Sequence, residues 1–308
     1  MAGAAHPCLR RSPARLRHPP FPEADVSPDI LFAANAGPTL KFDVDFFLRF
    51  VFQPSPALIG GLTITIYVAV FAQLVGTLLG TLSALAGMSR RRLLRAISAV
   101  YVWFFRGTPL LVQLFLVYFG TPYLLGGLDL FPRDVTLGFV NLRGAVLAGL
   151  VALSINEGAY MSEIVRAGIL SVDPGQTEAA KSLGMTYGLT MRRIVLPQAL
   201  RVIVPPLGNE FNNMLKTTSL MSIIAVEELF RVAQAANSAT FKSFEAYFGV
   251  ALYYLAMTTI WSAIQGRIEH RLGVSTGREA RASIWERIFG LSRRTTALGG
   301  VQPPGLGR

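Results

Sequence analysis

The sequence predicts an all-α, polytopic membrane protein, and three observations carry this prediction. Of the 308 residues, 52% are hydrophobic and only 15% are charged, whereas soluble domains carry about 25% charge. The mean hydropathy is +0.45. Charged residues separate long apolar stretches, each close to the roughly 20 residues with which a helix spans a bilayer.

We expect five transmembrane helices, at about residues 58–86, 96–119, 144–165, 195–217 and 246–265. The first contains no charge, and its Gly76 and Gly80 suit close packing between helices in lipid. In the second, the run from Arg106 to Pro109 (Arg-Gly-Thr-Pro) predicts a break in the helix. In the fourth, Pro205-Pro206 frees backbone carbonyls and predicts a kink.

The loops between these spans predict the orientation of the chain. Arginines cluster at 90–95, several lysines and arginines lie between 166 and 201, and Arg267 and Arg271 follow the fifth span. With five spans, all three places fall on one side of the membrane, and the positive-inside rule makes that side cytoplasmic. The N-terminus is therefore expected outside and the C-terminus in the cytoplasm.

The segments outside the transmembrane domain, residues 57–270, differ from it in composition. Residues 1–41 are rich in Arg and Pro, which predicts a disordered basic extension. Residues 42–56 are amphipathic, and we expect a short interfacial helix within them. Residues 271–308 form an Arg-rich tail, which we expect to be unpacked in the cytoplasm.

The cytoplasmic segment 171–197 is too polar to span a membrane and is patterned like a helical hairpin. A turn signal at Asp173-Pro174-Gly175 precedes a short helix expected over Thr177–Leu183. Gly184 can supply the positive φ that ends a helix, and a second short helix is expected over Tyr187–Arg193. Such a hairpin would suit docking into a partner's groove, although a plain connecting loop is equally compatible.

Ionisable residues inside the spans are candidates for function, because burying a charge in lipid is costly. Glu157 and Glu210 lie near the middle of the third and fourth spans. Tyr160 and Met161 share a helical face with Glu157. Four residues share one face of the fourth span: Asn209, Asn212, Asn213 and Lys216.

If these two faces meet, they form a pocket within the membrane that suits a zwitterion. Glu157 would hold an ammonium group, and the amides and Lys216 would hold a carboxylate. The alternative is that the amides join neighbouring helices and the charges pair with each other. Glu163 and Arg166, three residues apart, are expected to pair near the cytoplasmic surface as a structural or gate element, and Arg106 is a gate or marks a packing kink.

Four stretches of the chain together resemble a known family. The run EAAKSLGMTYGLTMRRIVLP is similar to the EAA motif of ABC importer permeases, and its matching residues are Glu178, Ala179, Ala180, Gly184, Ile194, Leu196 and Pro197. Three further stretches resemble the polar amino-acid uptake branch of these permeases: Phe105–Gly120, Gly158–Ile169 and Leu207–Ile224. The resemblance covers about residues 57–270, in order.

The resemblance implies a transport subunit of the bacterial inner membrane that is not itself an enzyme. It implies separate ABC ATPase subunits that bind ATP-Mg, a second permease subunit, identical or not, and an extracytoplasmic solute-binding protein. It makes segment 171–197 the element that couples to the ATPase. The chain agrees in one respect: it contains no G-x-x-x-x-G-K-[ST] phosphate loop, so we expect no cofactor bound by this chain.

The expected function is passage of a polar or charged amino acid, whose identity the sequence leaves open. An ion-coupled secondary transporter is the alternative, with Glu157 or Glu210 as relay, but the two halves show no internal repeat. Nucleic-acid binding is not expected, because the basic residues behind the net charge of +11 are divided among loops and tails. One cysteine and three distant histidines give no metal or catalytic site.

One acidic pair in the outer loop, Glu227-Glu228, lies close to Arg231. These residues could dock the binding protein. A solvated run of surface charge is the expected alternative.

Overall fold

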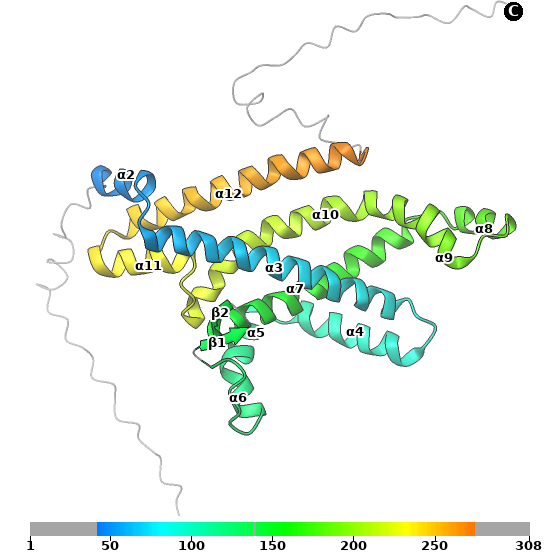
Figure 1. The fold of residues 1–308 in the computed structure, drawn as a ribbon, viewed down its shortest axis with the longest axis horizontal. Helices are drawn as coiled ribbons and strands as arrows, with labels where there is room; N and C mark the ends of the chain where they lie inside the picture. The colour runs from blue at the N-terminus through cyan, green and yellow to red at the C-terminus, as the bar shows by residue number, and fades with distance from the viewer. Residues whose placement is uncertain (1–41, 133, 138–139, 275–308) are drawn as a thin grey trace, which may run out of the picture. The chain divides into compact units, whose positions relative to one another are not determined.

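A computed structural model describes residues 42–132, 134–137 and 140–274 of the chain. The expectations for residues 1–41 and for the tail beyond residue 274 lie outside this range. From Asp43 onward the described chain belongs to one unit, and its elements are numbered as in Figure 1.

The unit consists of helices and one small β-hairpin. The α-helices are α2 (Val44–Phe52), α3 (Pro56–Gly87), α4 (Arg92–Gly107), α5 (Leu110–Phe115), α6 (Thr121–Leu124), α7 (Gly144–Leu170), α8 (Pro174–Ser182), α9 (Tyr187–Thr190), α10 (Leu196–Thr217), α11 (Leu229–Thr240) and α12 (Ser243–Arg271). Between them lie two π-helical turns, η1 (Leu116–Gly120) and η2 (Met191–Val195), and a 3₁₀ helix, η3 (Thr218–Ile224). Strands β1 (Asp134–Leu137) and β2 (Val140–Arg143) pair antiparallel, with Asp134 opposite Arg143.

Three helices are long and apolar enough to cross a membrane: α3, α7 and α12. The bent pair formed by α4 and the helical stretch Leu110–Leu124 makes a fourth candidate if it is counted as one span. Helix α10 occupies the place of the expected fourth span but carries three charged residues, and it is not among these candidates. The described residues thus support a polytopic helical protein, and the count of five spans stays a prediction.

The break predicted inside the second span is confirmed. The chain bends by 106° between α4 and α5, because Thr108 is extended and Pro109 lacks the N–H that would continue the helix. That missing N–H would have bonded the carbonyl of Phe105. The buried Gln113 donates to that carbonyl instead, at 2.9 Å from its Nε2.

Helices α3 and α7 pack closely because glycines of α3 face side chains of α7. A Cβ on Gly76 would lie 2.6 Å from Cγ of Glu157, and a Cβ on Gly80 would lie 2.4 Å from Cβ of Met161. Neither position therefore accepts a larger residue without movement. Nearer the N-terminal end of α3, Val68 and Ala72 pack with Leu153 of α7 in the main apolar core.

The segment between α7 and α10 folds as a helical hairpin, with two differences from expectation. Helix α8 begins at Pro174, three residues before Thr177, because the Asp173 side chain caps it by accepting from Gly175 N at 2.7 Å. Gly184 ends it with φ +77, as predicted, and Met185 N donates to Ala180 O, which satisfies a free helix carbonyl. The second helix does not stop at Arg193.

Instead, α9 continues through η2 directly into α10. Pro197 lies in the first turn of α10, and because α10 is continuous with η2, the missing N–H of Pro197 removes one hydrogen bond from this helical path. Helix α10 then runs through Pro205 and Pro206 as one α-helix, so the kink expected at these prolines is not accompanied by a break in the helix.

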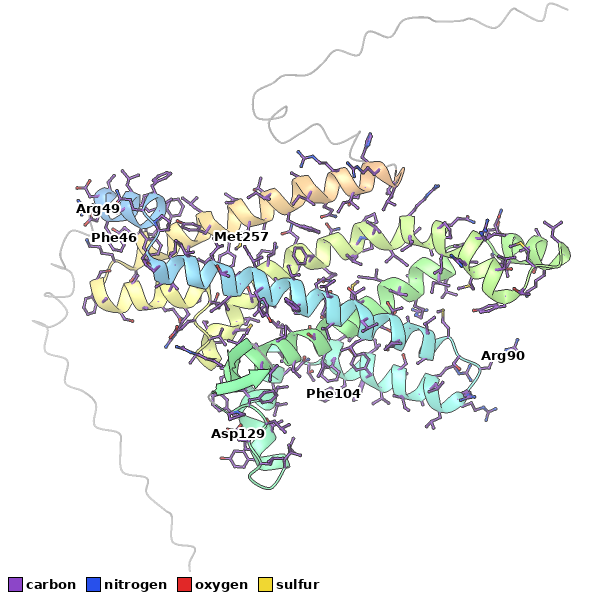
Figure 2. The ribbon with its side chains drawn as sticks, in the orientation of Figure 1. Phe46, Arg49, Arg90, Phe104, Asp129 and Met257 are labelled. Atoms are coloured by element: carbon purple, nitrogen blue, oxygen red, sulfur yellow. The ribbon has the colours of Figure 1, made fainter. Side chains whose placement is uncertain are left out.

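The two ends of the unit differ in what they carry. Helices α8 and α9 lie at the same end as the loop between α3 and α4, whereas α2 and α11 lie at the opposite end (Figure 1). Figure 2 labels Arg90 in that loop and Arg49 on α2, at these opposite ends. The basic loop and the helical hairpin therefore share one end, as the loop charges predicted.

Replacing Gly80 by Ala should destabilise the protein. The added Cβ would press on Met161 and on the carbonyl of Gly158, and such overpacking costs about 1–3 kcal/mol. We expect a lower midpoint of thermal unfolding in detergent. Gly60→Ala is the matched control, since a Cβ there meets nothing within 4 Å; equal midpoints for the two variants would contradict the packing argument.

Candidate functional site

A cavity of about 790 Å³ lies where the break between α4 and α5 meets α7, α10 and η3. Its charged and polar side chains come from α4, the break after it, α7 and α10: Arg106, Thr108, Asn156, Glu157, Tyr160, Glu210, Asn213, Lys216 and Thr217. The cavity thus brings Glu157 and Tyr160 of one predicted face together with Asn213 and Lys216 of the other.

Glu157 is the most deeply placed acid of the cavity, with only 4% of its surface exposed. Its Oε1 accepts a hydrogen bond of 2.9 Å from Nε2 of Gln73 on α3. Gly76, one turn further along α3, leaves the space that the Glu157 side chain occupies. A neutral amide, rather than a cation, therefore holds this buried carboxylate in position.

The four charged side chains of the cavity form no ion pair with each other. The ion pairs among the described residues are Arg143–Glu227, Arg166–Glu163 and Lys242–Asp43, and none involves the cavity. The Arg106 guanidinium lies over the Tyr160 ring, 5.3 Å from its centroid. The predicted pairing of intramembrane charges is therefore seen for Glu163 and Arg166 and not among the four charged residues of the cavity.

Three predicted pocket residues lie elsewhere. Met161 packs on Gly80, with its Sδ 3.3 Å from Gln73 Nε2. Asn209 accepts from Gln265 at 3.4 Å, and Asn212 donates to Ser262 at 3.3 Å, both on α12.

Asn209 and Asn212 lie outside the cavity because α12 packs against the side of α10 that carries them. Trp261 donates to Gly208 O at 2.8 Å, and Gln265 donates to Pro205 O at 3.2 Å. Helix α12 therefore covers one side of α10 as far as Asn212, and the side that carries Glu210, Asn213 and Lys216 opens into the cavity. The amides of Asn209 and Asn212 join helices, as the alternative for them predicted.

The sequence did not single out Asn156 and Gln113 as parts of the site. Asn156 Nδ2 donates to Phe105 O at 3.2 Å and to Gln113 Oε1 at 3.0 Å, so both residues close the broken end of α4. Both are polar residues in otherwise apolar spans, which could have marked them as candidates. The sequence alone does not predict which backbone carbonyl such a side chain binds.

A second cavity, of about 500 Å³, lies between α3, α4 and α7. Arg95, Glu163 and Arg166 line it, and Arg106 lines both cavities. Glu163 and Arg166 form the expected pair, with 2.7 Å between Oε2 and Nη2. Arg106 therefore stands at the boundary between two cavities, next to the bend of the helix.

The residues of the EAA-like run are mostly on the surface of the hairpin. Glu178, Ala179, Gly184, Leu196 and Pro197 are exposed, Ile194 is half-buried, and Ala180 is buried. Two apolar side chains beside them, Leu183 and Tyr187, are 82% and 74% exposed.

The expectation of a solvated outer charge run holds for Glu227 and is wrong for Glu228. Glu227 pairs with Arg143, and both side chains are exposed. Glu228 is fully buried and caps α11: its oxygens accept from Phe230 N at 2.8 Å, Arg231 N at 2.7 Å and Tyr254 OH at 2.9 Å. It holds α11 against α12.

A helical membrane unit with a charged cavity beside a broken helix, and an exposed helical hairpin at one end, is typical of the transmembrane part of a transporter. The chain belongs to the family described as binding-protein-dependent transport system inner membrane component, whose model matches residues 76–274. Its curated relatives are amino-acid ABC transporter permeases.

Two relatives from Bacillus subtilis (strain 168) show the extent of the similarity. The chain is 39% identical over 224 residues to the probable amino-acid permease protein YxeN, covering 73% of this chain and 95% of YxeN. It is 42% identical over 218 residues to the L-cystine transport system permease protein TcyB, covering 70% of this chain and 87% of TcyB.

Two solved structures of ABC transporters are similar to this chain over most of its length. A crystal structure of an amino acid ABC transporter with histidines superposes with a TM-score of 0.64 at 40% identity, covering 73% of this chain and 98% of that one. The MetNI methionine ABC transporter in an inward-facing conformation shares the fold, with a TM-score of 0.57 at 17% identity over 70% of this chain and 96% of that one.

The stability of the α11–α12 contact should depend on pH through Glu228. Burial raises the pKa of Glu228 from 4.5 to about 7, against the opposing effect of its three hydrogen-bond donors. A raised acid pKa means that the folded protein binds the proton more tightly, so the stabilisation is present at low pH and is lost as pH rises through about 7.

We expect Glu228→Gln to flatten the pH dependence of the thermal midpoint between pH 5 and 8, measured in detergent. Glu227→Gln, at the neighbouring exposed position, should leave the wild-type profile intact. An unchanged profile in Glu228→Gln would contradict the assignment of this titration to Glu228.

Proposed function

We propose that the chain is the transmembrane subunit of an ATP-driven importer and that the cavity beside Glu157 holds a polar or charged amino acid during passage. The observation that carries the proposal is the set of four cavity charges, two of each sign, that have no ion pair among themselves. A charged side chain at membrane depth is costly unless it meets an opposite charge. A ligand that carries charges of both signs would supply it.

In this proposal the two sides of the cavity bind the two ends of the amino acid. Glu157, which Gln73 keeps oriented, and Glu210 take the α-ammonium or a cationic side chain. Arg106, Asn213 and Lys216 take the carboxylate. The relatives named as amino-acid permeases support an α-amino acid as the substrate class.

The hairpin α8–α9 is the element we propose to dock on a separate ATPase, which binds the ATP-Mg that this chain has no phosphate loop to hold. Two features support it: the exposed apolar residues at the end of α8, and the unbroken helical path from α9 through η2 into α10. Because α10 carries Glu210, Asn213 and Lys216, a displacement of the hairpin would reach the cavity directly.

The family supports a proposal for the rest of the assembly. We propose five spans, with α4–α6 and α10 completing the three apolar helices, an N-terminus outside and a C-terminus in the cytoplasm of a bacterial cell. A second permease subunit, the same chain or a sister chain, and an extracytoplasmic solute-binding protein complete the importer. ATP-dependent uptake by the reconstituted assembly, and none by this chain alone, tests the proposal.

Glu157→Gln should reduce uptake while preserving assembly. The amide keeps the volume beside Gly76 but removes the charge, and losing a charge-assisted contact of about 1.5–3 kcal/mol predicts a decrease of about 10- to 100-fold. The measurement is ATP-dependent uptake in proteoliposomes that contain the complete importer. Glu227→Gln, outside the cavity, should transport normally, and normal uptake by Glu157→Gln would remove Glu157 from the proposed substrate site.

Gly184→Val should uncouple ATP hydrolysis from uptake. Gly184 has φ +77 with open space around it, so a β-branched residue meets backbone strain of about 1–2 kcal/mol and not a steric clash. We expect correct membrane insertion, with uptake and substrate-stimulated ATPase activity both reduced. Gly188→Val adds the same side chain in the same segment without a positive φ, and equal behaviour of the two variants would argue against the docking role.

A further inference from the structure

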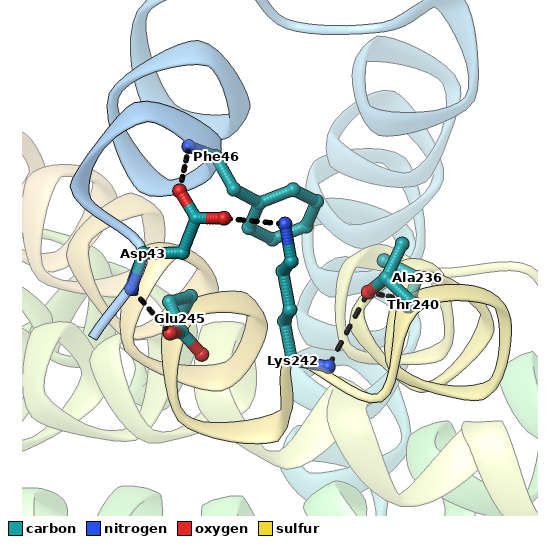
Figure 3. A network of polar contacts seen from close by, with 6 residues as sticks. All are labelled: Asp43, Phe46, Ala236, Thr240, Lys242 and Glu245. Carbon is teal, nitrogen blue, oxygen red and sulfur yellow. Dashed lines mark hydrogen bonds and ion pairs between the residues drawn. The ribbon is translucent and has the colours of Figure 1, made fainter. Parts of the chain in front are cut away.

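Helix α2 is fixed to the beginning of α12 by a polar network (Figure 3). The Asp43 carboxylate caps α2 by accepting from Phe46 N at 2.9 Å, and it pairs with Lys242 Nζ at 2.5 Å. The backbone N–H of Asp43 donates to Glu245 at 2.7 Å. The contact with Lys242 lowers the pKa of Asp43, so this carboxyl is charged at neutral pH.

Apolar contacts continue the attachment along both helices. The rings of Phe47 and Phe248 stack with 5.4 Å between their centroids, and Phe50 lies over Gly249, where a Cβ would approach its ring to 2.7 Å. Further along, Tyr253 OH donates to Val51 O at 2.6 Å.

Residues later in α2 contact residues later in α12, from Asp43 beside Lys242 to Val51 beside Tyr253. Helix α2 runs in the same direction as the start of α12 and extends to about its tenth residue, roughly 15 Å from the helix start at 1.5 Å per residue.

The side of α2 next to this contact is apolar and exposed. Val44, Leu48 and Phe52, spaced by four residues, form one stripe and are 54%, 44% and 74% exposed. Asp45 and Arg49, also four residues apart, lie on the adjoining side and are exposed. A nine-residue helix with this stripe exposed to water would be unfavourable, because each apolar side chain loses its hydrophobic stabilisation.

The neighbouring surface indicates what covers the stripe. Only 11% of the apolar window of α12 is buried inside the unit, against 61% for α7. Its exposed residues include Phe248, Leu255 and Ile260, at 44%, 61% and 62%. Because so little of α12 is buried by the rest of the unit, we infer that α12 faces lipid. Helix α2 is attached to the first turns of α12.

We propose that α2 inserts beside α12 into the leaflet that α12 enters first, with the stripe Val44–Leu48–Phe52 facing acyl chains. Because α2 and α12 run in the same direction, the three positions lie at increasing depth, with Val44 at the headgroups and Phe52 in the hydrocarbon. Asp45 and Arg49 remain on the side open to headgroups and water. This inference does not rest on the proposed function.

Spin labels can measure this depth profile. The chain has one cysteine, Cys8, so Cys8→Ser gives a background for single cysteines at Val44, Leu48 and Phe52, with Asp45 and Arg49 as matched controls on the polar side. The stripe residues are exposed, so these substitutions remove little packing. The full chain is placed in phosphatidylcholine nanodiscs, and collisions with oxygen, which partitions into lipid, are compared with those of a water-soluble nickel chelate.

We expect the ratio of oxygen to nickel collisions to rise in order from position 44 to 48 to 52, and to be several-fold higher at 52 than at 45 or 49. Equal nickel access at 52 and 49 would overturn the proposal, since the stripe would then face water. Protection of 48 and 52 from both reagents would also overturn it, since protein, such as a second copy of the chain, would then cover the stripe.

Discussion

The close approach of α3 and α7 is the contact on which the candidate site depends. Gly76 and Gly80 let the two helices come together, and this places Gln73 within 2.9 Å of the Glu157 carboxylate. Without the glycines the helices would stand further apart, and Gln73, the donor to this buried acid among the described residues, would be out of reach. An amide, and not a cation, therefore binds this carboxylate at membrane depth. Arg106 and Lys216 of the cavity form no ion pair with it.

The break after α4 makes the other wall of the cavity, and it follows from a single missing donor. Pro109 cannot donate to Phe105 O, so the helix ends and the chain turns by 106°. In lipid an unsatisfied carbonyl is unfavourable, and Gln113 and Asn156 satisfy it from α5 and α7. Their bonds fix the position of the turn, and with it Arg106, which lines both cavities.

The sequence predicted the features that local chemistry determines. The positions of α3, α7 and α12, the break at Gly107-Thr108-Pro109 and the positive φ of Gly184 all follow from composition, from proline or from glycine, although α7 and α12 run on to Leu170 and Arg271, past the expected ends at 165 and 265. The sequence did not predict the surroundings of a side chain where these depend on a neighbouring helix. Nothing local distinguishes Asn209, which faces α12, from Asn213, which faces the cavity, and the exposed Glu227 stands next to the buried Glu228. A helix that is apolar on all sides does not show in its own sequence which side meets protein.

Helix α10 joins the two parts of the molecule that would have to move together. One end continues from the hairpin through η2, and the other carries Asn213 and Lys216 into the cavity. The prolines at 205 and 206 remove two bonds from the middle of this helix, which locally lowers its resistance to bending. At the same level, α12 binds α10 through Gln265 to Pro205 O and Trp261 to Gly208 O. The segment of α10 from Pro205 to Asn212 is therefore held to α12, and the last turn, with Asn213 and Lys216, borders the cavity, so a bend at the prolines falls between the hairpin and the segment that α12 holds.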